Sequence, residues 1–498
     1  MSPPGWRREI EYRLLRWQAL LDTRSADRVL PWFYAAVIAV ALGALSLARY
    51  RSLENGVELG RYVQGAWLLA EGQEPVTSLS GEHLFSSQTP LIFWPISILT
   101  RYVPTAPTLL IIQAIALAVA VVPLYILARQ VANLRVGASS ALVLVYALYP
   151  AVHDLNLADF HPEALAIAPM IGMALASLSG HWWRYWTFML AVLMCRADFG
   201  VAVAGWGIFL TLRSERRQGL LTVSAGIAWI VAALGFVHPA LDETGVSVVA
   251  SLEEYGDTPF GVLWGMLSSP FTVLGDVFSR GNFTDLAVLF APLLFLPLVA
   301  MRYFLPIVPL WFVYLAADVD EGPFGAPHLS VPAIAFLFVA ATFGLAKAGT
   351  LGVERITVNR RILGALMVTA LVFFARDAFA TPYNEPWNWS ARDSADQARR
   401  AAVELVPDDA AVQASPFALP LLAERTEAYV LDTATTVIAA ERSLTDSTYV
   451  LFDESATDNW SSIWVDNFHR NLVQQGRYTP IYHAAGITLY CRGCPVPA

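Results

Sequence analysis

Two clusters of acidic, histidine and aromatic residues stand next to long apolar runs, and their side chains could do chemistry. The first cluster runs from Glu54 to Trp67 and carries Glu54 and Glu58, four residues apart. A helix would place both carboxylates on one face. A carboxylate held near lipid has a raised pKa, which suits a general base, whereas in a wet loop both groups would simply be solvated. His83 follows in the same loop, where a lone histidine is most often a solvated or capping residue.

The second cluster, Asp159-Phe-His161-Pro-Glu163, lies between two apolar runs. Ionisable groups at membrane depth are expensive and usually functional. Pro162 breaks the helix and lets three polar side chains converge. All three could bind a divalent metal, but their spacing fits no established metal motif. Hydrogen bonding to a sugar or a phosphate is therefore the favoured interpretation.

Arg196 and Asp198 interrupt a third apolar run, and His328 opens a later one. The arginine and aspartate could be no more than a charge-compensated pair. Alternatively, Arg196 holds a phosphate and Asp198 orients it. His328 has the same two interpretations, a loop residue or a member of the site.

The elements that must position these residues are membrane helices. The chain has 498 residues, of which 56% are hydrophobic and only 15% charged, and its mean hydropathy is +0.50. Repeated apolar runs of this kind indicate an α-helical polytopic membrane protein. Eleven spans are predicted, near residues 31–49, 107–128, 136–152, 163–180, 183–197, 199–212, 219–238, 285–300, 303–317, 327–347 and 361–380.

The arginines of the connecting segments predict how these spans are oriented. They gather on one side together with the N-terminal arginines, so the N-terminus is predicted to be cytoplasmic. Residues 1–30 then form a cytoplasmic interfacial helix, and residues 31–380 form the membrane domain. The loops at 50–106 and 239–284 and the tail at 381–498 lie outside the membrane. Both acidic clusters thus meet at the outer membrane-water boundary of a multi-pass protein.

The tail has the composition of a small soluble α/β domain. Its eight arginines are outnumbered by fifteen acidic residues, which argues against a nucleic-acid partner. Cys491 and Cys494 end this domain, and outside the cytoplasm a small disulfide loop is favoured over a metal or redox site. The sequence has no phosphate-binding glycine loop in a supporting context, so nucleotide-driven chemistry is disfavoured.

These elements resemble a family of bacterial polytopic membrane proteins of unknown function whose architecture is similar to the GT-C glycosyltransferases. The family's Asp-Leu-Gly-x-Tyr-x-Gln-x-x-Trp element corresponds here to Glu58–Trp67, with Glu58 replacing the aspartate. Its Asp-Phe-His-Pro-Glu element is unchanged at residues 159–163. Other matching positions, or positions within these elements, are Tyr62, Gln64, Trp67, His83, Arg196, Asp198 and His328.

The resemblance implies transfer of a sugar, of the mannose or arabinofuranose type, from a polyprenyl-phosphate donor to an envelope glycan or glycolipid. It implies Glu58 as the general base and the other matched residues as substrate-binding groups. The predicted location is the plasma membrane of a bacterium, among membrane lipids. No cofactor is clearly indicated, although a divalent metal would be compatible with the acidic cluster. A transporter or flippase of lipid-linked sugars is the main alternative, and a non-catalytic envelope scaffold is another.

Overall fold

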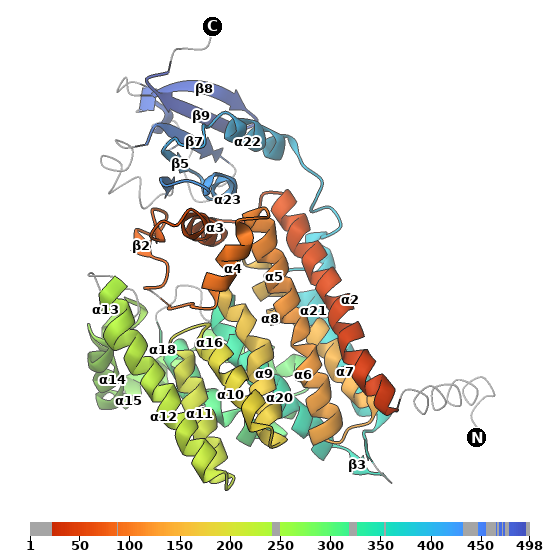
Figure 1. The fold of residues 1–498 in the computed structure, drawn as a ribbon. Helices are drawn as coiled ribbons and strands as arrows, with labels where there is room; N and C mark the ends of the chain where they lie inside the picture. The colour runs from red at the N-terminus through yellow and green to blue at the C-terminus, as the bar shows by residue number, and fades with distance from the viewer. Residues whose placement is uncertain are drawn as a thin grey trace, which may run out of the picture.

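A long helical bundle carries a small mixed domain at one end (Figure 1). The computed structural model describes residues 22–86, 88–241, 250–317, 326–352, 355–431, 447–454, 465, 468–470, 472–473 and 478–494. The prediction of an interfacial helix at residues 1–30 falls mostly on residues 1–21, outside the described part. Residues 24–30 belong to the first long helix, α2 (Arg24–Arg51), whose N-cap is Thr23.

Apolar composition makes the bundle, because each long helix can bury a stripe against its neighbours. Its central helix is α20 (Val331–Lys347), of which nearly every residue is buried. Other helices of the bundle are α5 (Thr105–Val119), α6 (Val121–Ile126), η1 (Leu127–Val131), α7 (Val136–Ala147), α8 (Pro150–Leu157), η2 (Pro162–Ala166), α9 (Ile167–Leu178), α10 (Trp182–Leu193), α11 (Phe199–Leu212), α12 (Arg216–Ala232), η3 (Ala233–Val237), α13 (His238–Leu241), α18 (Val308–Ala316) and α21 (Arg360–Asp377).

The described helices fit some of the eleven predicted spans better than others. Five are long and apolar enough to cross a membrane, namely Arg24–Arg51, Thr105–Val131, Arg216–Leu241, Pro327–Lys347 and Arg360–Asn384. The pair α7 and α8, bent by 42°, adds a sixth if it counts as one span. Shorter apolar helices at Pro162–Leu178, Phe199–Leu212 and Leu305–Ala316 match three more predicted spans. A polytopic helical fold is confirmed, while the number of spans and their orientation stay predictions.

The predicted span at 285–300 is not one helix. α16 (Arg280–Phe290) ends there, and η5 (Ala291–Leu293) and α17 (Leu296–Val299) follow. Leu294 and Phe295 have left-handed backbones, with φ of 50° and 55°. Pro292 and Pro297 remove two backbone donors in this stretch, which explains the interruption. Before it, the loop predicted at 239–284 contains the end of α13 and the short helices η4 (Ala250–Tyr255), α14 (Pro259–Ser268) and α15 (Pro270–Val277).

The tail is a small α/β domain, as the sequence predicted. Its five-stranded sheet has the order β6-β5-β7-β9-β8. β5 (Val412–Ala414) is parallel to β6 (Ala428–Val430) and β7 (Tyr449–Asp453), whereas β9 (Ile487–Arg492) is antiparallel to β7 and β8 (Tyr478–Ala484). Helices α22 (Ser394–Glu404) and α23 (Leu419–Leu422) pack on this sheet. Parallel strands need such covering helices because neither sheet face is polar enough to be left bare.

A layer of short elements lies between bundle and domain: α3 (Val57–Ala70), β1 (Val76–Thr77), β2 (Glu82–His83) and α4 (Phe93–Thr100) (Figure 1). Buried polar groups fix the domain on this layer. Gln64 of α3 donates to the carbonyl oxygens of Arg425 and Thr426, at 3.0 and 3.3 Å. Ser78 both donates to the Ala428 oxygen and accepts from the Ala428 nitrogen. The domain is therefore held by directional bonds above α3.

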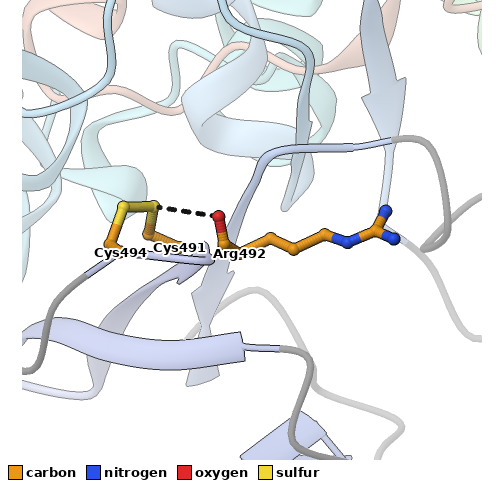
Figure 2. The surroundings of a disulfide bond; sticks show 3 residues. All are labelled: Cys491, Arg492 and Cys494. Atoms are coloured by element: carbon orange, nitrogen blue, oxygen red, sulfur yellow. Dashed lines mark hydrogen bonds between the residues drawn. A yellow bond between two sulfur atoms is a disulfide. The ribbon is translucent and has the colours of Figure 1, made fainter.

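A disulfide joins Cys491, near the end of β9, to Cys494, which follows the strand (Figure 2). Gly493 between them has φ of 75°, a conformation that glycine adopts without strain. Cys195 is reduced and buried.

Because disulfides persist in oxidising compartments, we expect Cys491 and Cys494 to resist a membrane-impermeant maleimide on intact cells until reductant is added. Mass spectrometry of the labelled protein measures this. Buried Cys195 should stay unlabelled in the folded protein and serves as the internal control. Labelling without reductant would exclude the disulfide, and labelling only after lysis would place the domain in the cytoplasm.

Candidate functional site

A break in the bundle positions the Asp159–Glu163 cluster. α8 ends at Leu157, Asp159 has a left-handed φ of 59°, and Pro162 starts the next helical turn. The break frees backbone groups that need partners in a buried setting. Gln113, fully buried in α5, supplies them: its amide nitrogen donates to the Leu155 and Asp159 oxygens at 3.0 and 2.8 Å. Its amide oxygen accepts from the His161 nitrogen at 2.7 Å.

Asp159 caps the helix that carries Glu58. Its carboxylate accepts from the backbone nitrogens of Gly56, at 3.0 and 3.1 Å, and Leu59, at 3.3 Å. The side chain of Asn55 donates to it as well, at 2.9 Å. A carboxylate at a helix N-terminus satisfies free donors and complements the helix dipole. Asp159 thus sets where α3 begins, and through α3 the position of Glu58.

Replacing Asp159 by asparagine should lower the free energy of unfolding by about 1 kcal/mol, because the amide loses the negative charge that the helix dipole favours. Asparagine tolerates the left-handed backbone, so this loss reports the carboxylate. Asp159→Ala should cost more because alanine also strains the backbone. Thermal unfolding in lipid nanodiscs measures both variants, and an Asp159→Asn protein as stable as wild type would contradict the capping role.

Arg196 joins two carboxylates next to this break. Its Nε donates to both oxygens of Asp198, at 2.9 and 3.0 Å, and its Nη1 donates to Oε1 of Glu163 at 3.2 Å. Tyr314 of α18 donates its hydroxyl to Asp198 at 2.7 Å. The Glu163 side chain is only 1% exposed and Arg196 12%. Charges this deep need pairing, and the network supplies it.

Two buried acceptor or donor atoms in this network have no partner in the described part of the chain. They are Oε2 of Glu163 and Nδ1 of His328. The His328 ring stacks on that of His161, with centroids 4.7 Å apart. Unpaired buried polar atoms are rare in native proteins and call for an explanation such as a ligand or water. The arrangement is therefore one that a polar ligand would complete.

Glu58 faces the same region from the first turn of α3. Its side chain is 45% exposed, and its Oε2 lies 3.7 Å from Nη1 of Arg61. Arg61 also interacts electrostatically with Glu163, and the positive charges of Arg61 and Arg196 both repel a proton on His328. The site therefore combines an accessible carboxylate with two arginines and a histidine pair.

The remaining predicted residues lie around this group. Tyr62 is buried and packs edge-on against Phe160, with centroids 5.3 Å apart. The Gln64 amide is occupied by the C-terminal domain, and Trp67 lies near the end of α3, half-buried. His83 sits in β2, where its Nδ1 accepts from the Phe85 nitrogen at 3.2 Å and burial lowers its pKa. The structure thus brings Glu58, His161, Glu163, Arg196, Asp198 and His328 together, with Asp159 and Tyr62 supporting them.

A metal site is the predicted alternative for these acids. Within the described residues, no three His, Cys, Asp or Glu side chains are placed so that they could hold a metal ion. Arg196 already neutralises one oxygen of Glu163 and both oxygens of Asp198. The described donors do not fit a metal centre, so no step of the chemistry is assigned to one.

Comparison with known proteins identifies the family. The family described as a predicted membrane protein, DUF2079, matches residues 49–489. The chain belongs to the DUF2079 family. The match contains every residue of the site described above, from Glu58 to His328. No curated protein matches the chain.

The fold of this DUF2079 protein is similar to a solved structure, ArnT from Cupriavidus metallidurans in the apo state. The TM-score is 0.55 at 12% sequence identity, over 91% of this chain and 96% of ArnT. ArnT has the GT-C glycosyltransferase fold, so the GT-C-like architecture predicted from the sequence is confirmed.

Three residues of the site were not singled out from the DUF2079 sequence: Gln113, Tyr314 and Arg61. Gln113 stands alone in an apolar run, and that isolation is a signal, since a buried amide must find partners. Tyr314 gave no signal because tyrosines are common in apolar helices. Arg61 follows Glu58 by three residues, a spacing at which helical side chains pair.

Proposed function

We propose that this protein is an integral membrane glycosyltransferase that moves a sugar from a polyprenyl-phosphate donor to a cell-envelope glycan or glycolipid. Transfer takes place at the outer membrane face, and the sugar is of the mannose or arabinofuranose type. Support comes from the GT-C-like fold, the accessible carboxylate of Glu58 and the buried arginine network beside it.

The observation that carries the proposal is an apolar groove whose lining includes Cys195, the residue directly before Arg196 in the chain. The groove has a volume of about 870 Å³ and runs between α5–α6 and α9–α10. Cys195 and Ile92 line it, and the Ile92 nitrogen donates to the Met194 oxygen at 2.9 Å. A lipid carrier has the same two parts, an apolar chain and a phosphate. The groove suits the chain, and the adjoining Arg196 suits the phosphate.

The chemistry needs a base and a place for the leaving group. In the proposed reaction Glu58 takes the proton of an acceptor hydroxyl, whose oxygen attacks the anomeric carbon. The bond from that carbon to the phosphate oxygen breaks, and the lipid phosphate leaves with the electron pair. Glu58 suits this role because its carboxylate is exposed enough to meet an acceptor.

Charge that develops on the phosphate needs fixed donors. Among the described residues, Nη2 of Arg196 has no hydrogen-bond partner, and Nδ1 of His328 is also unpaired. Both could donate to phosphate oxygens, while Oε2 of Glu163 could accept from a sugar hydroxyl. These roles use three atoms of the site that have no hydrogen-bond partner in the described part of the chain.

The test is sugar transfer by the purified protein in lipid nanodiscs. Radiolabelled polyprenyl-phosphate mannose, arabinofuranose and other sugars would be offered with envelope glycan extracts as acceptors. Transfer from one donor supports the proposal and names the sugar. Lipid binding without transfer from any donor would favour the alternative, a transporter or flippase of lipid-linked sugars. A protein that neither binds lipid-linked sugars nor transfers sugar would refute both the glycosyltransferase and the flippase.

A further inference from the structure

A second cleft lies where the bundle, the connecting segment 378–393 and the C-terminal domain meet (Figure 1 shows the junction of these parts above α2). Its volume is about 450 Å³, within the range of roughly 300–1,000 Å³ typical of small-molecule sites. Its lining combines Glu54 with residues of the segment 384–393 and with Asp396, Arg399 and Phe417 of the C-terminal domain.

We infer that this junction cleft binds neutral sugar residues of the acceptor glycan. The inference rests on the proposed function, which requires such an acceptor. The lining offers carboxylates and side-chain amides together with Trp389 and Phe417. Carboxylates accept from sugar hydroxyls and amides both donate and accept, while the accessible edges of the two rings offer apolar contact to sugar C–H groups.

The charge of the cleft selects against anionic ligands. Its lining has four acidic residues, Glu54, Glu385, Asp393 and Asp396, and one cation, Arg399. Arg399 is bonded to Asp396 at 2.9 Å and to the buried Asp453 at 2.7 Å. A phosphate or a uronic acid would meet excess negative charge, so a neutral saccharide fits best.

Much of the lining is held in place before any ligand arrives. Asp393 and Asp396 form a reciprocal capping box at the start of α22. The Trp389 indole donates to the Asn384 oxygen at 2.9 Å, and Asn388 donates to Glu385 at 2.7 Å. Preformed polar groups lose little freedom on binding, which favours affinity.

The cleft and the proposed general base lie on the same chain segment. Glu54 lines the cleft, and four residues later the same segment carries Glu58. Between them, Asn55 and Gly56 are fixed by Asp159. Four residues span at most about 14 Å, so a glycan held in the cleft would lie near Glu58. Burial raises the pKa of Glu54, as expected for a carboxyl group partly withdrawn from water at the edge of the cleft.

Binding of oligosaccharides to the full-length protein in nanodiscs tests the inference. The probes are neutral manno-, arabino-, gluco- and galacto-oligosaccharides, with oligogalacturonates as acidic counterparts. We expect at least one neutral series to bind, and the variant Glu385→Gln with Asn388→Ala to weaken that binding about tenfold or more. Both residues are exposed, and glutamine keeps the length of Glu385 at its left-handed backbone, so folding should persist.

Two controls separate this site from the catalytic one. Gln397→Ala changes an exposed residue of the same helix, α22, outside the cleft and should leave binding unchanged. Glu58→Gln removes the proposed base and should still bind oligosaccharide. Failure of every neutral series to bind, stronger binding of acidic ones, or equal binding by the cleft variant would each overturn the assignment.

Transfer assays on the same preparation distinguish this inference from the proposed function. Sugar transfer without any binding of neutral oligosaccharides would support the glycosyltransferase activity and refute the saccharide site in the cleft. If the wild-type protein binds neutral oligosaccharides but transfers no sugar, and the cleft variant loses this binding, the cleft assignment is supported and the proposed function is wrong.

Discussion

Sugar transfer by Glu58→Gln should fall by about 10²–10⁴-fold, the usual contribution of a general base. Glutamine keeps the size of the side chain but cannot take a proton. Because the side chain is 45% exposed and its nearest described cation, Arg61, lies 3.7 Å away, the fold should be little affected. Initial rates with the donor that wild type uses measure the effect.

Glu71→Gln is the matched control for this change. Glu71 is exposed at the other end of the same helix, α3. The Glu71→Gln variant should therefore transfer sugar at the wild-type rate. If Glu58→Gln transfers sugar at the wild-type rate, the protein is still a glycosyltransferase but its general base is another carboxylate. Asp159 would then be the next candidate, although all its observed contacts are those of a helix cap.

The sequence predicted the general fold because membrane helices follow from apolar length alone. It failed at 285–300, where the prolines Pro292 and Pro297 divide an apolar run into short pieces. Hydropathy averages over a window and does not register where a backbone donor is missing. The small α/β character of the tail domain followed from a composition shift, but the strand order and the mixed strand directions did not, since strand pairing is long-range.

The grouping of the candidate site was only partly predictable. Asp159, His161 and Glu163 are neighbours in sequence, so their proximity needed only the proline break. Nothing local indicated that the Gln64 amide would meet carbonyl oxygens more than 350 residues away. Nor did spacing show that Asp159 would cap a helix a hundred residues earlier. Tertiary contacts decide which polar residues remain available to a substrate, and a single sequence does not contain them.

Replacing Arg196 by methionine should destabilise the protein by about 3–5 kcal/mol, because removing one member of a buried ion pair leaves the other uncompensated. Glu163 would be that residue, with its side chain 1% exposed. Thermal unfolding in nanodiscs measures this loss. The double variant Arg196→Met with Glu163→Gln should recover most of the stability, since replacing both members of a buried pair is often nearly neutral.

The activities of the Arg196 variants then separate stability from catalysis. If Arg196 binds the donor phosphate, the double variant stays inactive although it is folded. Arg196→Lys should fold and transfer sugar about 10–100-fold more slowly, since a lysine keeps the charge but loses one charge-assisted hydrogen bond of about 1.5–3 kcal/mol. A stable double variant that transfers sugar at the wild-type rate would show that the network only balances charge. The phosphate would then be bound by another cation, and Arg61 is the cation described beside Glu58.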